Sequence, residues 1–247
     1  MADSPSYAVS DVKGVQLWLL REGQQEVFVD PASEFVRHCD GGPRALLHVG
    51  SVPSPVPCKA ARMPSGDYRI QLDAGSRVLP PVVVVSMTAL PERVKPPPPD
   101  EAELKALLDV ERAARARFAA DARRDFLANY GGSTAQYDQR LAAIEASARY
   151  RSRAASRWKL NTPRGPVYLS PLGAAPDAIG WDLVYAVYQA GPQGLKETGR
   201  FVGCVEGFRD VDGDGVPDVF TTTCENDEGV GYAFISVAGP IQRLMSH

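Results

Sequence analysis

The stretch CVEGFRDVDGDGVPDVFTTTC, which runs from Cys204 to Cys224, decides the fold of the C-terminal part of the chain. Short runs rich in β-branched and aromatic residues flank a loop of Asp and Gly, which is the pattern of a strand–loop–strand hairpin. If Asp210 pairs with Asp218, Cys204 stands directly opposite Cys224, because both pairs are centred on Asp214. Cβ atoms of such partners lie about 4.5–5.5 Å apart, so a small adjustment can close a disulfide. The stretch therefore predicts a hairpin closed by a Cys204–Cys224 bond.

The aspartates of this loop have the spacing of calcium ligands. Calcium takes about six to eight oxygen ligands at about 2.3–2.6 Å, and a short loop supplies them from every second position, with a glycine at the sharp turn. A bound dication also offsets the mutual repulsion of four neighbouring carboxylates. We therefore expect bound Ca²⁺, and a metal-free acidic turn is the alternative. Gly215 is at the turn, and the expected ligands are Asp210, Asp212, Asp214, the carbonyl of Val216 and Asp218.

The loop departs from an EF-hand because Thr221 replaces the usual glutamate at its last ligand position and because its flanks read as strands. It resembles the strand–loop–strand calcium loop of FG-GAP/VCBS-type repeats, found in β-propeller blades of surface proteins, and is similar to thrombospondin type 3 and dockerin loops. The resemblance covers residues 203–220 and the strand that follows, and it implies a calcium site on these aspartates. It does not imply a propeller, because the motif occurs once.

The missing glutamate indicates weak calcium binding, with a Kd of about 10⁻⁴ M. Three acidic residues, Glu225, Asp227 and Glu228, follow the hairpin. They either add a further ligand or form a solvated turn, and we expect the solvated turn.

The four cysteines fall into two pairs of similar spacing, Cys39 with Cys58 and Cys204 with Cys224. Neither pair has the CxxC pattern of a zinc or redox site. Each bond would close a loop of about 20 residues, which contributes about 3 kcal/mol in the chain-entropy model. Two disulfides indicate a periplasmic, cell-surface or secreted location. The first residues lack a signal-peptide pattern, so we expect the mature form of an exported protein.

The 247 residues divide into four segments of different composition. Residues 1–92 contain short strand-like runs separated by turns, which predicts a small antiparallel β-sandwich or barrel, with the sandwich as the preferred form. Residues 93–100 include four consecutive prolines and predict a stiff linker. Residues 101–160 are rich in Ala, Leu, Arg and Glu and predict an antiparallel helical hairpin, and residues 161–247 return to strands around the calcium loop. The predicted fold class is α+β, mainly β.

The helical segment has clear start and stop signals. Asp100 with Glu103, and Ser133 with Gln136, match the capping box, and Gly131 is placed to end the first helix. The second helix leads into RYRSRAASRWKLNTPR, residues 149–164, which contains basic but no acidic side chains. Such a run can bind nucleic acid, but we interpret it as a solvated helix face because the basic excess is small.

No catalytic, phosphate-binding or dinucleotide-binding motif occurs in the sequence, and no apolar run approaches the roughly 18 residues of a membrane span. We therefore predict no catalytic residues and no organic cofactor. We expect an exported, calcium-binding, non-catalytic interaction protein of the cell envelope. Its partner would be another envelope or surface protein rather than nucleic acid, with the helical hairpin as a docking element.

Two alternatives remain open from the sequence. The first is an envelope hydrolase in which calcium is structural and paired carboxylates in a cleft have raised pKa values. The second is a cytosolic protein with four free thiols and a metal-free acidic turn.

Overall fold

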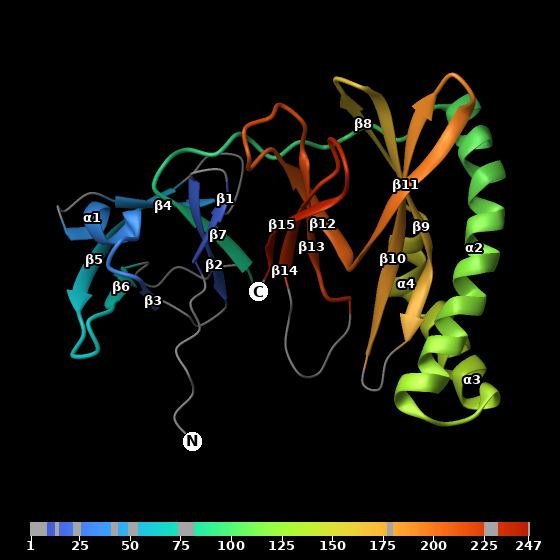
Figure 1. Cartoon of the computed structure of the whole chain (residues 1–247), viewed down its shortest axis with the longest axis horizontal. Helices are drawn as coiled ribbons and strands as arrows, with labels where there is room; N and C mark the ends of the chain where they lie inside the picture. The colour runs from blue at the N-terminus through green and yellow to red at the C-terminus, as the bar shows by residue number, and fades with distance from the viewer. Residues whose placement is uncertain are drawn as a thin grey trace. The chain divides into compact units, whose positions relative to one another are not determined.

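A computed structural model describes residues 9–12, 15–21, 26–40, 44–48, 54–73, 82–176, 180–224 and 232–246 (Figure 1). The chain forms two compact units. The first contains the described residues up to Arg93 together with Asp210–Asp212, and the second contains Val94–Arg209 and Gly213–Ser246. Residues 210–212 are nevertheless part of the loop that joins β12 to β13 in the chain.

The first unit is a seven-stranded antiparallel sheet with one short helix, and its strand order is β1-β2-β7-β4-β5-β6-β3. The strand-like runs of the sequence correspond to β2, β3, β4, β6 and β7. Two prolines obscure the alternation of β5, and the seven-residue α1 is too short to show a helical pattern. In chain order the elements are β1 (Val9–Val12), β2 (Val15–Arg21), β3 (Glu26–Val29), α1 (Glu34–Asp40), β4 (Arg44–His48), β5 (Ser54–Arg62), β6 (Tyr68–Leu72) and β7 (Val82–Ser86).

The sheet of the first unit is continuous, whereas a sandwich would have two packed sheets and a barrel one closed sheet. Strand β5 pairs with β4 through residues 54–57 and with β6 through residues 58–62. Buried side chains from both halves of the sheet, such as Trp18 and Ile70, pack into one cluster with Phe35 of α1. The disulfide between Cys39 and Cys58 ties α1 to β5, with their Cα atoms 5.2 Å apart. One bent sheet therefore encloses the core of this unit.

The second unit contains three helices and two four-stranded antiparallel sheets, with strand orders β11-β10-β9-β8 and β12-β13-β14-β15. The helices are α2 (Glu101–Tyr130), α3 (Thr134–Ala146) and α4 (Ala148–Ala154). The strands are β8 (Trp158–Thr162), β9 (Gly165–Pro176), β10 (Trp181–Gly191), β11 (Gly194–Val202), β12 (Cys204–Arg209), β13 (Asp218–Thr222), β14 (Tyr232–Ser236) and β15 (Gln242–Ser246).

The passage from one sheet to the other occurs at Gly203, between β11 and β12. Its φ of +127° is unfavourable for other residues. A Cβ atom there would lie 2.9 Å from the carbonyl oxygen of Thr222. Glycine is therefore required where the chain leaves β11 and enters β12.

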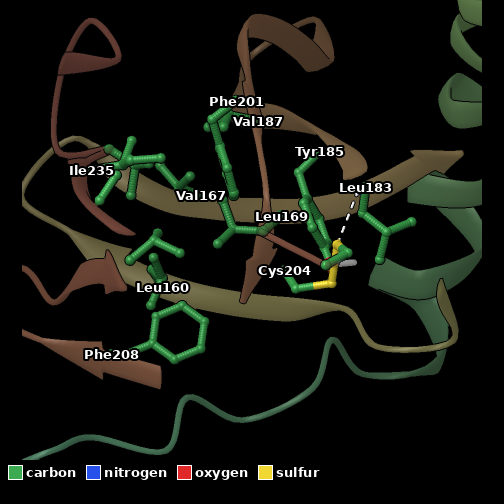
Figure 2. Close-up of a cluster of buried hydrophobic side chains, with 14 of the residues drawn as sticks. Leu160, Val167, Leu169, Leu183, Tyr185, Val187, Phe201, Cys204, Phe208 and Ile235 are labelled. Carbon is green, nitrogen blue, oxygen red and sulfur yellow. Dashed lines mark hydrogen bonds between the residues drawn. A yellow bond between two sulfur atoms is a disulfide. The ribbon is translucent and has the colours of Figure 1, made fainter. Parts of the chain in front are cut away.

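The β8–β11 sheet is buried on both faces. Along β10, Leu183, Tyr185 and Val187 belong to the cluster shared with the β12–β15 sheet, which Figure 2 shows. The intervening Val184 and Tyr188 belong to a second cluster that includes residues of α2. Figure 1 shows α2 running beside this sheet. The second unit therefore has three layers, and the helices predicted for residues 101–160 form one unit with the strands that follow.

The helices begin and end close to their predicted positions. Both predicted capping boxes are present, at Asp100 with Glu103 and at Ser133 with Gln136. The second predicted helix breaks at Ser147, and its last residues become the start of β8. No described helix combines the length and the apolar character needed to cross a membrane.

The proline-rich linker is packed against the second unit rather than free. The amide of Val94 donates a hydrogen bond to the carbonyl of Phe208 on β12 (2.9 Å). The amide of Lys159 on β8 donates to the carbonyl of Pro97 (3.0 Å). The linker thus covers the exposed edge strand of each sheet, and prolines suit this place because they offer no amide for further strand pairing.

Candidate metal centre

The Asp/Gly loop joins two antiparallel strands, as predicted, but the strand register differs from the predicted one. Arg209 pairs with Asp218 next to the loop. A bulge after Val205 then shifts the pairing, so that Cys204 stands opposite Thr222. A bulge adds one residue to one strand and increases its local twist. The symmetrical register predicted from the sequence is therefore wrong, although the hairpin itself is present.

The disulfide between Cys204 and Cys224 forms despite the shifted register. The two Cα atoms lie 5.0 Å apart, and both cysteines are fully buried. The amide of Cys224 donates to a carboxylate oxygen of Asp182 (2.7 Å), and the amide of Leu183 donates to Sγ of Cys224 (3.2 Å), as Figure 2 shows for the second bond. The disulfide thus links the hairpin to β10 of the other sheet.

Three of the four predicted aspartates come together at the base of the loop. Carboxylate oxygens of Asp210, Asp212 and Asp218 all lie within 4.8 Å of one another. Asp218 begins β13 and is 1% exposed, whereas Asp210 and Asp212 are half-buried. Three carboxylates at this distance repel one another, and a cation among them removes that repulsion. Oxygen ligands of this kind suit calcium.

The fourth aspartate, Asp214, shapes the loop and is not in this cluster. Its Oδ1 accepts a hydrogen bond from the amide of Val216 (2.8 Å), which is an Asx-turn. Gly213 and Gly215, on either side, have φ values of +73° and +83°, which glycine adopts most readily. The Val216 side chain is buried and anchors the loop. The downstream acidic residues Glu225, Asp227 and Glu228 lie outside the described residues.

A buried ion-pair group on α2 was not predicted from the sequence. Glu111 is 2% exposed and accepts hydrogen bonds from Arg157 and from the hydroxyl of Ser170, and Arg115 forms an ion pair with it. Burial raises the pKa of Glu111, but these hydrogen bonds and positive charges outweigh burial and hold the pKa below its ordinary value. Arg157 and Ser170 lie 46 and 59 positions from Glu111 in the sequence, so no local pattern identifies these two partners.

A second acid on α2, Glu103, connects the helix start to the sheet. Besides its capping bond to the amide of Asp100 (2.9 Å), Glu103 accepts a hydrogen bond from Lys159 and one from the Tyr168 hydroxyl (2.8 Å). The Lys159 hydrogen bond is the main cause that lowers the pKa of Glu103. Both Glu103 and Glu111 therefore have lowered pKa values, whereas the general acid of a hydrolase requires a raised one.

The basic run of residues 149–164 contributes to these ion pairs. Arg153 contacts Glu206 (2.8 Å), and Arg157 and Lys159 contact the two acids on α2. The prediction of a wholly solvated basic face is therefore wrong for these three side chains. Their charges are compensated within the second unit.

No model of a protein family matches the chain, and neither the curated proteins nor the solved structures contain a match. The interpretation of the loop therefore rests on its own residues and on the geometry of the hairpin.

Proposed function

We propose that this chain is a calcium-stabilised, non-catalytic interaction protein of the cell envelope or the extracellular space. The observation that carries the proposal is the approach of the Asp210, Asp212 and Asp218 carboxylates to within 4.8 Å of one another. In this proposal the ion binds these three carboxylates and the carbonyl of Val216, while Asp214 shapes the turn and adds negative charge. The FG-GAP/VCBS-type loop that the sequence resembles implies a calcium site on the aspartates of this loop, which supports the proposal.

The two disulfides support the proposed location. All four cysteines of the chain are paired, and the pairing indicates an oxidising compartment. Calcium sites of extracellular modules typically have Kd values of about 10⁻⁴–10⁻³ M. A weak site of the kind proposed for this loop is of use only where calcium reaches similar concentrations.

The partner in this proposal is another envelope or surface protein, and the helical layer is the proposed docking element. Its inner face packs against the β8–β11 sheet, so only its outer face is accessible to a partner. That face includes two exposed large apolar side chains, Leu108 and Tyr130. Exposed apolar side chains of this size are common anchors in protein interfaces.

The experiment that tests the calcium site is a thermal melt without reductant, in excess chelator and again in calcium. At about ten times the Kd, calcium should stabilise the second unit by about 1.4 kcal/mol. This corresponds to a rise in melting temperature of about 3–6 °C. The rise should vanish in Asp212→Ala and persist in Asp109→Ala, which removes an exposed aspartate of α2. An equal rise in both variants, or none in the wild type, would remove the basis of the proposal.

A further inference from the structure

Strand β11 is an edge strand whose outer side has no hydrogen-bond partner in the described part of the chain. Each four-stranded sheet of the second unit has two edge strands, and the proline-rich linker bonds to one of them, β8 in the first sheet and β12 in the second. β11 is the other edge of the first sheet. Its outer backbone groups form no hydrogen bond with any described backbone or side chain. An open edge of this kind is a template for pairing with another strand.

The pairing of β11 with β10 shows which backbone groups point outward, away from β10. Residue pairs along an antiparallel ladder alternate between hydrogen-bonded and non-hydrogen-bonded pairs. The amide of Gly203 donates to the carbonyl of Leu183 (2.9 Å), so Phe201, two residues earlier, is also hydrogen-bonded to β10. Arg200 and Val202 alternate with these residues and therefore present their amides and carbonyls to the outer side.

The other half of β11 follows the same rule. Gly194 pairs with Gly191 across a two-residue turn, and the pair that closes such a turn is hydrogen-bonded. Lys196, two residues later, is then hydrogen-bonded to β10. The residues between, Leu195 and Glu197, direct their backbone groups outward.

A bulge between the two halves keeps their outward positions on one face of the sheet. The pairing shifts after Val187 of β10, which leaves Thr198 as the extra residue of β11. Glu197 and Arg200, on either side of it, contact each other at 2.6 Å. In chain order the outward positions carry an apolar, an acidic, a basic and an apolar side chain, and this order complements itself in an antiparallel pair. The four residues are Leu195, Glu197, Arg200 and Val202.

We propose that β11 pairs antiparallel with β11 of a second copy of this chain and joins the two β8–β11 sheets into one. A two-fold axis at the bulge places outward residues opposite one another. Glu197 then faces Arg200 of the second copy, and Leu195 faces Val202. Opposite charges and apolar side chains at directly opposed positions stabilise a sheet, and the two-fold symmetry makes each pair occur twice.

The exposure and the bulge of the edge are both compatible with this occupant. Val202 is 45% exposed, and pairing with Leu195 of the second copy would cover it. A bulge normally discourages strand addition because it twists the edge. In the two-fold arrangement the two bulges face each other, so neither one shifts the register of the pair. The proposal does not rest on the calcium site.

The test measures the oligomeric state of the full chain, with its disulfides intact, by sedimentation velocity at protein concentrations up to about 100 μM. The wild type should dimerise. Glu197→Arg alone and Arg200→Glu alone each place like charges opposite one another twice, so each should weaken dimerisation at least about tenfold. An equimolar mixture of the two variants should dimerise again, because each acid then faces an arginine of the other variant. Mixing cannot repair the ion pair inside each chain, so recovery separates pairing between copies from a structural effect.

Two further variants serve as matched comparisons. Lys196→Glu reverses a charge on the same strand, at a position hydrogen-bonded to β10, and should dimerise like the wild type. Val202→Lys places a charge opposite Leu195 of the second copy and should weaken dimerisation about tenfold, with an unchanged melting temperature because the position is exposed. A monomeric wild type would overturn the proposal. So would charge variants that dimerise like the wild type, or a mixture of folded variants that stays monomeric.

Hydrogen exchange followed by NMR gives a second measurement. The amides of the four outward residues should exchange fast at low protein concentration and slowly at high concentration. The amides of Lys196 and Phe201 should be protected at both concentrations, because they are hydrogen-bonded to β10. Slow exchange of the outward amides in a monomeric protein would show that the chain itself covers this edge, which would also overturn the proposal.

Discussion

Glu111 on α2 accepts two hydrogen bonds from Arg157, one from Nε (3.1 Å) and one from Nη2 (2.8 Å). Each bond reaches a different oxygen of the carboxylate, which is the strongest form of this pair. The Glu111 side chain is 2% exposed and that of Arg157 is 15% exposed. Arg157 directly precedes β8, so the pair fastens the long helix to the strand that begins the sheet.

Replacing Glu111 with glutamine should destabilise the second unit by about 3 kcal/mol, because it leaves the largely buried guanidinium of Arg157 without a counter-charge. The measurement is urea unfolding followed by circular dichroism at neutral pH. Glu145→Gln serves as the matched control, since Glu145 is exposed on α3 and should change stability by less than about 0.5 kcal/mol. Equal stability of the two variants would show that the ion pair contributes nothing to folding.

The lowered pKa values of Glu103 and Glu111 predict a stability that falls in acid. Each carboxylate has a folded-state pKa below its ordinary value of 4.5, so its contribution is complete above that value. It is lost as the pH falls through the lowered folded-state pKa. Unfolding free energies measured from about pH 6 to about pH 3 should therefore decline more steeply in the wild type than in Glu111→Gln. Parallel curves for the two proteins would contradict the prediction.

Tyr168 and Tyr188 are direct cross-strand partners on β9 and β10. They differ in the hydrogen bonding of their hydroxyl groups. The Tyr168 hydroxyl donates to Glu103, whereas that of Tyr188 has no partner within the described residues. Tyr168→Phe should therefore cost about 1.5–3 kcal/mol, as expected for a hydrogen bond to a charged group. Tyr188→Phe should be neutral or stabilising by up to about 1 kcal/mol.

The two phenylalanine variants control for each other, because both remove one hydroxyl from neighbouring positions in the same buried cluster. Chemical denaturation of both, beside the wild type, gives the two differences in unfolding free energy. Destabilisation by Tyr188→Phe equal to that of Tyr168→Phe would show that the Tyr188 hydroxyl is hydrogen-bonded in solution.

Local sequence signals predicted the elements of this fold better than their arrangement. The capping boxes at Asp100 and Ser133 and the strands on either side of the Asp/Gly loop depend on residues close together in the chain, and all are present. The predicted register of β12 and β13 was wrong by one residue next to the loop, where Arg209 rather than Asp210 pairs with Asp218, and by one more beyond the bulge, which has no clear sequence signature. The contacts of Glu111 with Arg157 and Ser170 join residues 46 and 59 positions apart, so only the folded arrangement reveals them.

In the candidate metal centre, too, the sequence identified the residues but not their arrangement. Spacing in the sequence identified four aspartates, and the hairpin brings Asp210, Asp212 and Asp218 together because strand pairing places the two ends of the loop side by side. The separate position of Asp214 follows from its hydrogen bond to the amide of Val216. An alternating pattern of aspartates gives no information on which carboxylate turns back to the loop backbone.

The different places of Asp212 and Asp214 predict unequal effects on calcium binding. Asp212→Asn removes a charge from the three-carboxylate cluster and should raise the calcium Kd by at least about tenfold, since affinity follows the number of charged ligands. Asp214→Asn keeps an oxygen that can accept the hydrogen bond from Val216, so the turn should persist and the Kd should rise less. Isothermal titration calorimetry of both variants, with Asp109→Asn as a control for net charge, measures the difference. Matching melting temperatures in chelator would show that both variants fold alike. A loss of affinity in Asp214→Asn as large as in Asp212→Asn would mean that Asp214 is a ligand equal to the others in the calcium-bound loop.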